Sequence, residues 1–569
     1  MCVSLGRGAA PFLASTDEPA MTACRGPSPE ARQCVRAMVS VARSARWPVP
    51  RAPSRAAVVA AGCLALAVVS LAFPAAPTFD PWAWVVFGRE VVVPSLGLST
   101  VAFTGWKPLP VLFTAPLALF GAAAPSLWLV VARTAGLAAM VLAFRLAARV
   151  GGRVAGAIAA VALLACDNWL RFLSAGNVEP LVVALLLGAI ELHLRGRRAA
   201  AFLLAALVGL ARPEVWPLLG AYAVYLARSD RRWWPLAVGI PGMLALWIVP
   251  DWIGSGDPLR TFHSAEVSSE PHALQRTGTP WLGLVRGAVA IAPAPVWIGT
   301  LSALALWWRN RDRTVAALAL VAAAWTLPTV IGTALGYPAV PRYLFEPVAI
   351  CCVLAGIGLV ALVRLARDPR ARAALAVTLA VISAPFVVTR ATGLGRQAAW
   401  AEGWADQASA LWRAVDRAER HAPVARLHPV VEPRAMANGL AWKLGVRLDD
   451  VAGSFTPGTR IAFLAGNVRA VIARLHRRNA TARHLTRAGP WHVVLVHWSP
   501  NDRGPPTGAK ELASPARAPR DAAQRPARPP PAAPPRPRRL HARSAARAPP
   551  VIARNPDRCS TWPRPRACG

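Results

Sequence analysis

Charged side chains recur near the outer ends of the apolar blocks in this 569-residue chain. An ionised group close to hydrocarbon is costly, so each of these residues needs a reason to be there. Carboxylates and cations together suit a site that deprotonates a hydroxyl group and binds an anionic lipid head group. The candidates are Asp80, Arg89, Glu90, Lys107, Asp167, Arg171, Glu179, Arg212, Glu214, Asp251, Arg342 and Glu346.

Two of these candidates lie shortly after the first apolar block. Asp80 stands in FDPWAWVVFGRE and Lys107 in TGWKPLPVLF. Asp80 could act as a general base between aromatic residues, although on spacing alone a solvated loop acid is the simpler interpretation. Lys107 could neutralise a phosphate group or extend its ammonium to the membrane interface.

Three more candidates lie near later apolar blocks. Arg212 and Glu214, in GLARPEVWP, interrupt two short blocks and could form either a buried ion pair or part of a site. Arg342, in VPRYLFEP, begins a later block from the outer side. It could be an interfacial anchor, but arginine is less expected on that side than on the cytoplasmic side.

Other polar residues favour ordinary structural roles. Glu179, in SAGNVEP, is typical of a helix start. His263 and His272, with Glu266 and Glu270, fit no strong metal-ligand spacing. We therefore expect no metal site from these residues, and the sequence leaves the question of a divalent metal open.

Long apolar blocks must position the candidates. The chain is 55% hydrophobic and only 16% charged, with a mean hydropathy of +0.38, and several blocks approach the ~20 residues that a membrane-spanning helix needs. We predict an all-α polytopic membrane protein of about eleven transmembrane helices. The expected spans are 56–73, 127–147, 154–165, 178–194, 199–210, 217–226, 234–249, 288–308, 315–335, 344–363 and 373–388.

The arginine clusters give these spans an orientation. Short connections such as 195–198, 309–313 and 364–372 are rich in arginine, as cytoplasmic connections are. The sequence therefore predicts a multi-pass protein of the cell membrane with a cytoplasmic N-terminus and an external C-terminal domain. The same rule accounts for the formal charge of +36. Because arginine is dispersed, no nucleic-acid partner is expected.

Four domains are expected. Residues 1–54 form a disordered cytoplasmic leader, and residues 55–390 form the transmembrane domain. Residues 391–500 form a small external α/β domain with an amphipathic helix at about 396–420 and a strand at 493–498. Residues 501–569 form a disordered tail rich in proline and arginine. Residues 108–120 are too short to span and are expected to lie at the outer interface as a helix.

The order of four motifs resembles the GT-C superfamily of membrane glycosyltransferases, in the group that includes protein mannosyltransferases and aminoarabinose transferases. The motifs are the Asp of FDPWAW, the Lys-Pro of WKPLPVLF, the Arg-Pro-Glu of LARPEVW and the Arg-Tyr of PRYLFEP. An arginine in the span after the Lys-Pro motif, Arg133, accompanies them. The resemblance covers about residues 56–390. The arginine- and alanine-rich composition is typical of a GC-rich bacterial genome, and we expect a member of actinobacterial type.

The resemblance implies a polyprenyl-phosphate sugar as the donor and an acceptor on the outer side, which would be an envelope glycan, lipid or protein. Asp80 would then be the catalytic base. The substrate-binding candidates are Glu90, Lys107, Arg212, Glu214, Arg342 and Tyr343. The chain departs from the family pattern in two places, since Lys-Pro-Leu-Pro replaces Lys-Pro-Pro and Glu90 lies ten residues beyond Asp80.

Two other functions remain open. A transporter or flippase of a lipid-linked envelope precursor would place charges near the bilayer midplane and show two related halves, whereas the charges here are expected on one side. A non-catalytic scaffold for envelope assembly would differ from the transferase in activity alone. Convergence of Asp80, Lys107, Arg212 and Arg342 around one site would favour the enzyme.

Overall fold

The computed structural model describes residues 54–101, 105–229, 234–263, 279–336, 340–451, 455 and 458–498. The leader expected at 1–54, except Ser54, and the tail expected at 501–569 lie outside the described residues. So do His272, Glu266 and Glu270. The chain divides into a unit of residues 1–504 and a unit of residues 505–569, and every described residue belongs to the first.

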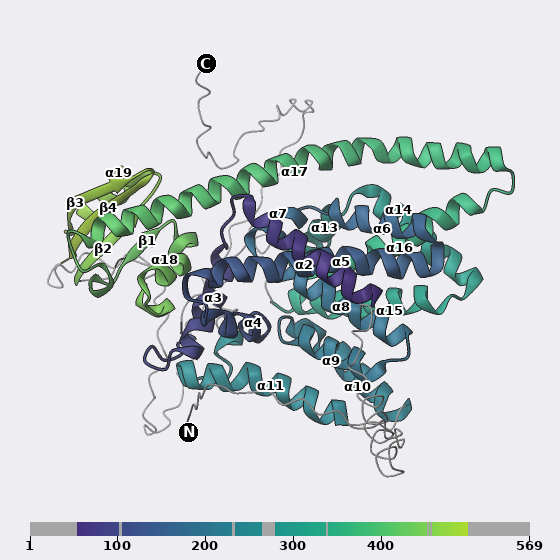
Figure 1. Ribbon diagram of the computed structural model, residues 1–569, viewed down its shortest axis with the longest axis horizontal. Coiled ribbons are helices and arrows are strands. Elements are labelled where there is room, and N and C mark those ends of the chain that lie inside the picture. The colour runs from purple at the N-terminus through teal and green to yellow at the C-terminus, as the bar shows by residue number, and fades with distance from the viewer. Residues whose placement is uncertain are drawn as a thin grey trace, which may run out of the picture. The chain divides into compact units, whose positions relative to one another are not determined.

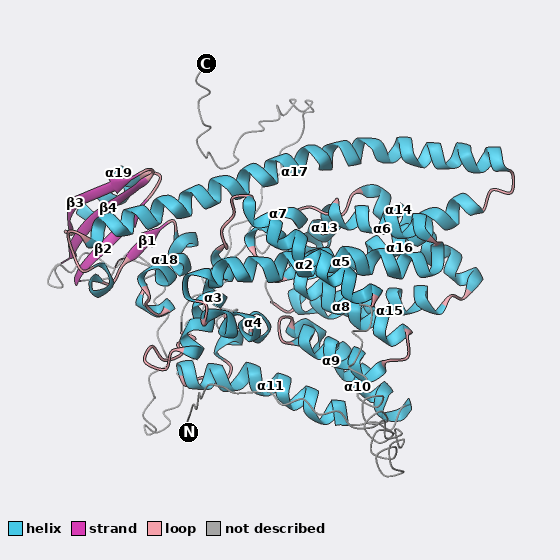
Figure 2. Ribbon diagram, in the orientation of Figure 1, coloured by secondary structure: helices cyan, strands magenta, loops and turns pink. Residues whose placement is uncertain are grey.

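Helices make up most of the described chain (Figure 1, Figure 2). They are α2 (Arg55–Val69), α3 (Phe79–Val92), α4 (Pro108–Ala118), α5 (Ala124–Gly151), α6 (Arg153–Leu164), α7 (Trp169–Ala175), α8 (Glu179–Leu194), α9 (Arg198–Gly209), α10 (Trp216–Ser229), α11 (Trp234–Ser255), α13 (Pro280–Ile291), α14 (Ala294–Asn310), α15 (Arg313–Ala334), α16 (Phe345–Arg364), α17 (Pro369–Glu419), α18 (Ala437–Leu444) and α19 (Val468–His476).

Six helices of the described chain are long and apolar enough to cross a membrane, or up to eight if each of two bent pairs is one span. The bent pairs are α6 with α7, at 66°, and α13 with α14, at 99°. The predicted count of eleven is therefore not confirmed. It treated every apolar block as a span, whereas α8, α9 and α10 have 16, 12 and 14 residues, below the ~20 that hydrocarbon requires.

Helix α16 forms the centre of the bundle. It packs against α14, α6, α5 and α15, and 72% of its most apolar window is buried. Glycines allow this close packing, as small residues do between membrane helices. A Cβ atom on Gly356 or Gly358 would collide with the backbone of Ala155 or Gly299. The second half of α16 therefore packs closely against α6 and α14.

The segment between the expected spans 56–73 and 127–147 contains a helix that precedes residue 108. α3 occupies Phe79–Val92 and buries both tryptophans of its first two turns, Trp82 and Trp84. It packs against α4 and α18. The predicted helix at 108–120 is confirmed as α4, which begins at Pro108 where a missing N–H costs nothing.

A four-stranded sheet follows the helices. Its strands are β1 (Val430–Glu432), β2 (Gly458–Leu464), β3 (Thr481–Ala488) and β4 (Trp491–Trp498), in the order β1-β2-β4-β3. β1 and β2 are parallel, and the other two pairings are antiparallel. The expected strand at 493–498 lies in β4. The expected amphipathic helix is the second half of α17, whose 51 residues cross position 390 without a break (Figure 1).

Candidate active site

Backbone contacts bring four separate parts of the chain to one place. The N–H of Thr78 donates to the carbonyl of Ala175, so the start of α3 lies against the end of α7. The N–H of Leu109 donates to the carbonyl of Leu210, so the start of α4 lies against the end of α9. Asp80, Glu179 and Arg212 follow these contacts by a few residues at most, and Lys107 precedes Leu109 by two residues.

Asp80 lies in the first turn of α3, where its negative charge is favoured by the helix dipole. Its Oδ2 accepts a hydrogen bond from Arg342 Nη2 at 3.1 Å, and 25% of the side chain is exposed. Burial raises the pKa of the Asp80 carboxyl, but the Arg342 and Lys107 cations together lower it by more than burial raises it. The pKa of Asp80 therefore lies below the usual value. Asp80 is therefore ionised and oriented.

Lys107 is held next to the other cations. It precedes α4, and the neighbouring Trp106 is fixed by hydrogen bonds to Thr261 Oγ1 and to the carbonyl of Leu246. The Lys107 ammonium lies 5.7 Å from the centre of the Trp84 ring. Burial and the nearby Arg212 guanidinium lower its pKa. Within the described ranges no carboxylate lies within 4.0 Å of it.

Arg212 lies between two buried carboxylates. Its Nη2 is 3.1 Å from Glu179 Oε1, and its Nε is 2.9 Å from Glu346 Oε1. All three side chains are at most 3% exposed. Arg342 joins this group, because its Nε lies 4.0 Å from Glu179 Oε1. The result is a continuous chain of charges from Glu346 through Arg212, Glu179 and Arg342 to Asp80.

Tyr343 and Glu214 border this charge chain. The Tyr343 ring lies 5.4 Å from the guanidinium carbon of Arg212, and its carbonyl accepts from the indole N–H of Trp325. Glu214 is near enough to interact electrostatically with both Arg212 and Tyr343. The predicted candidates Asp80, Lys107, Arg212, Glu214, Arg342 and Tyr343 thus converge.

Glu90 lies elsewhere. Its Oε2 accepts from the N–H of Ser99 at 3.1 Å and its Oε1 from the N–H of Leu448 at 3.0 Å. It therefore links the end of α3 to the short helix η7 (Leu448–Asp450), more than two helical turns from Asp80. The structure does not bring Glu90 to the charge cluster with the other candidates.

Glu179 and Glu346 were among the outer-end charges, but the motifs assigned neither of them to substrate binding, and both are partners of Arg212. An acid in the first turn of an apolar helix is ordinary on its own. The available signal was that α8 and α16 both carry one at the expected outer end, as EP dipeptides at Glu179 and Glu346.

No group of three or more His, Cys, Asp or Glu residues among the described positions could hold a metal ion. His263 forms a pair with Asp257 at 2.7 Å and is more than half exposed.

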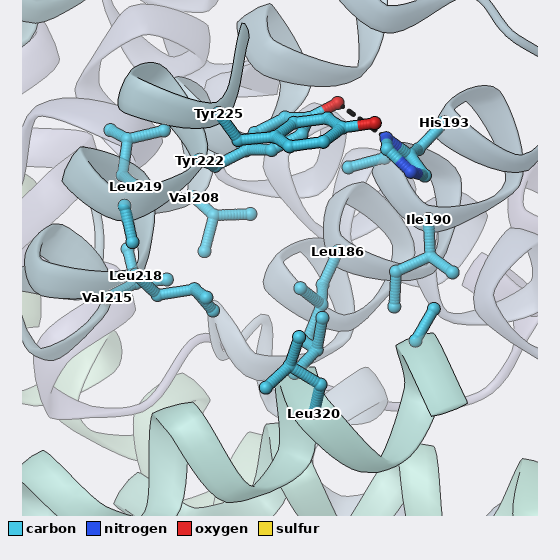
Figure 3. A pocket seen from close by; sticks show the side chains of 15 residues that line it. Leu186, Ile190, His193, Val208, Val215, Leu218, Leu219, Tyr222, Tyr225 and Leu320 are labelled. Atoms are coloured by element: carbon cyan, nitrogen blue, oxygen red, sulfur yellow. Dashed lines mark hydrogen bonds between the residues drawn. The ribbon is translucent and has the colours of Figure 1, made fainter. Parts of the chain in front are cut away.

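An apolar cavity of about 420 Å³ lies between α8, α9, α10 and α15. It begins at Val215, three residues after Arg212, and reaches His193 and Tyr222 near the other end of α8. Figure 3 shows leucine and valine side chains around it, with the hydrogen bond from His193 to Tyr222 at one margin. A cavity with this lining fits a hydrocarbon chain.

No family model and no curated protein matches the chain. Among solved structures, it is similar to ArnT from Cupriavidus metallidurans bound to undecaprenyl phosphate, at 15% identity over 78% of this chain and 99% of ArnT, with a TM-score of 0.49. It is also similar to the Archaeoglobus fulgidus oligosaccharyltransferase in complex with Zn and sulfate, at 14% identity over 68% of this chain and 62% of the other, with a TM-score of 0.43. Both TM-scores are below 0.5, so neither likeness assigns a function to this chain.

Proposed function

We propose that this chain is a membrane glycosyltransferase that moves a sugar from a polyprenyl-phosphate donor to an acceptor hydroxyl group on the outer face of the cytoplasmic membrane. The single observation that carries the proposal is the Asp80 carboxylate, bound to Arg342 at 3.1 Å and accompanied by the Lys107 ammonium. The Asp80 carboxylate can take a proton while the adjacent Arg342 or Lys107 cation binds a phosphate group.

The reaction would proceed by displacement at the anomeric carbon. Asp80 takes the proton of the acceptor hydroxyl as its oxygen attacks that carbon. The bond from the anomeric carbon to the phosphate oxygen breaks, and the electron pair leaves with the phosphate. Lys107 and Arg342 stabilise the negative charge that develops there. The products are the glycosylated acceptor and the polyprenyl phosphate, and the proton of the acceptor hydroxyl is on Asp80.

The remaining charged groups support Arg342. Glu179 faces both Arg212 and Arg342, so it holds the two guanidinium groups in fixed positions. Arg212 was predicted to bind the donor phosphate, and its two carboxylate partners favour a positioning role for it. The apolar cavity below Val215 would receive part of the polyprenyl chain.

The one-sided cluster also bears on the transporter alternative. The charged residues lie at the starts of α3, α8 and α16, not along their middles. A transporter that carries a charged head group across the bilayer needs polar groups along its path. The charge distribution therefore favours transfer on one face.

The test is transfer of labelled sugars from a panel of polyprenyl-phosphate hexoses and pentoses to the envelope fraction of membranes containing the full chain. Asp80→Asn is expected to lower the rate about 10²- to 10⁴-fold, the usual contribution of a general base. Asp167→Asn is the matched control, because Asp167 is also an outer-end acid paired with an arginine, Arg390 at 3.2 Å, but lies outside the cluster.

Near-normal transfer by Asp80→Asn at equal protein level would show that Asp80 is not the base. If the wild-type chain binds the donors but transfers none of them, the scaffold interpretation replaces the enzyme.

A further inference from the structure

Two adjoining cavities lie at the opposite end of α16 from the charge cluster. The first, of about 880 Å³, is lined by the ends of α5, α14 and α16 and the start of α15. The second, of about 840 Å³, lies between α6, α14, α16 and α17. Gly151 and Arg364 line both. Arg364 lies 18 residues after Glu346 in α16, so about 27 Å separates these two side-chain positions along the helix.

The first cavity is basic. Arg309, Arg364 and Arg367 line it, and no described carboxylate lies within 4.0 Å of any of them. Arg364 donates one hydrogen bond, to the carbonyl of Gly151 at 3.0 Å. The cavity contains one acid, Asp312, whose Oδ1 already accepts the N–H groups of Thr314 and Val315. Guanidinium groups with free donors are suited to a phosphate group.

The second cavity is apolar. Its α6 side runs from Arg153 to Ala165 and its α17 side from Ala376 to Val387. Twelve residues of α6 extend about 18 Å, slightly more than half of the ~30 Å hydrocarbon thickness of a bilayer. The groove therefore has the length of one leaflet, and it begins at the basic end.

Helix α17 makes this groove accessible from the membrane. None of its most apolar window is buried, although that window has a hydropathy typical of a span. Figure 1 shows α17 running beside the bundle formed by α6, α14 and α16. A spanning helix that packs so little against its own chain leaves space that hydrocarbon must fill.

We propose that the two cavities bind one anionic phospholipid, with its head-group phosphate on Arg309, Arg364 and Arg367 and an acyl chain in the groove beside α17. The cavities meet at Arg364, where a glycerol backbone would lie. Basic pockets between membrane helices are known to recognise anionic head groups. This lipid is distinct from the donor, whose phosphate is proposed to bind at the other end of α16.

The head-group test uses the purified full chain, titrated with phosphatidylglycerol or phosphatidylcholine in mixed micelles and followed by native mass spectrometry. Phosphatidylglycerol should bind and phosphatidylcholine should bind more weakly. The double variant Arg309→Gln/Arg367→Gln should weaken phosphatidylglycerol binding about tenfold or more, because it removes two charged donors. Arg313→Gln/Arg370→Gln is the matched control, since it removes the same charge from the same two connections without touching the cavity.

The groove test compares two neighbouring positions on α17. Ala380→Phe fills the groove and should weaken lipid binding, whereas Val381→Phe adds the same bulk at an exposed position that does not line it. Thermal unfolding of each variant without added lipid separates loss of binding from loss of folding.

Equal loss of binding in the two arginine double variants would overturn the proposal, because it would reduce the effect to general surface charge. Equal binding of the two phospholipids would also overturn it. So would displacement of phosphatidylglycerol by inorganic phosphate alone. Displacement of phosphatidylglycerol by polyprenyl phosphate at equal concentration would assign the cavities to the donor and also overturn it. None of these results depends on sugar transfer, so failure here leaves the proposed reaction untouched.

Discussion

At the scale of single residues, Arg212 shows how a buried charge is kept. Two carboxylates, Glu179 and Glu346, lie within 3.1 Å of its guanidinium group, and all three side chains are almost fully buried. Removing water from such charges costs several kcal/mol per ion, which is repaid only when each charge has its partners. The triad is therefore a rigid support, and removal of its one cation leaves two buried acids facing each other.

Arg212→Met should lower the free energy of unfolding by about 3–5 kcal/mol, the usual result of breaking a buried ion pair. Thermal unfolding of the detergent-solubilised protein measures the change. Arg342→Met is a suitable comparison, because 36% of that side chain is exposed and its loss should affect transfer more than folding. An Arg212→Met variant as stable as wild type would contradict a supporting role.

Lys107 is expected to affect donor binding more than folding, which is the opposite of what is expected of Arg212. It is the cation of the cluster with no described carboxylate within 4.0 Å, so it is the one best able to accept a phosphate. Lys107→Gln should raise the KM for the lipid donor about tenfold or more, since a charged hydrogen bond is lost, and should leave the unfolding temperature almost unchanged. Lys107→Arg should restore part of the affinity. A KM equal to wild type in the Gln variant would remove Lys107 from the donor site.

At the scale of elements, α3 connects the cluster to the segment that carries the sheet. Asp80 lies at its start, and Arg89 and Glu90 lie near its end. Arg89 donates to the carbonyls of Trp442, Ala441 and Val446 at the end of α18, while Glu90 accepts from Ser99 and Leu448. The junction and the proposed base thus lie at the two ends of one short helix.

This junction should respond to pH. Burial raises the pKa of Glu90 to about 7, against the hydrogen bonds from Ser99 and Leu448. A pKa that is higher in the folded state stabilises the protein at low pH, and this stabilisation is lost as the pH rises from about 4.5 to about 7. The loss amounts to roughly 3 kcal/mol. Unfolding measured across this range should show the decline, and Glu90→Gln should flatten it. An unchanged slope in that variant would assign the decline to other groups.

Elements also explain how far the sequence could predict this structure. Apolar blocks and arginine clusters predicted α5, α15 and α16 well, because a long uncharged run has few alternatives. The same pattern counted as separate spans some blocks that a polar break, such as Arg212 to Glu214, ends early, and that count is not confirmed. The helix α3 was missed because its apolar residues do not follow a single face, and most of it is buried on all sides.

The sequence likewise predicted some residues of the charge cluster correctly and misplaced another. Motif order predicted that Asp80, Lys107, Arg212 and Arg342 belong together, and the structure brings them together. It also predicted Glu90, which lies near Asp80 in the sequence but points to η7. Spacing along the chain cannot distinguish the two ends of a helix, and only the contacts of Ser99 and Leu448 do so.

At the scale of the described chain, the charge cluster and the sheet are expected on one side of the membrane. Asn438, in α18, donates to the carbonyl of Phe79 at the start of α3, and Trp404, in the second half of α17, donates to the carbonyl of Pro77. The first half of α17 has the length and hydropathy of a span. The start of α17, near Arg370, should therefore face the side opposite to the sheet.

This arrangement predicts which positions an impermeant maleimide can reach in intact cells. Arg469→Cys, on α19 of the sheet segment, should be labelled, whereas Arg370→Cys, at the start of α17, should be labelled only after the cells are lysed. Both side chains are exposed, so burial cannot account for a difference. The nine native cysteines are first replaced by serine or alanine, and that background serves as the unlabelled control. The reverse pattern would place Asp80 on the cytoplasmic side, and labelling of both positions would mean that the start of α17 does not cross the membrane.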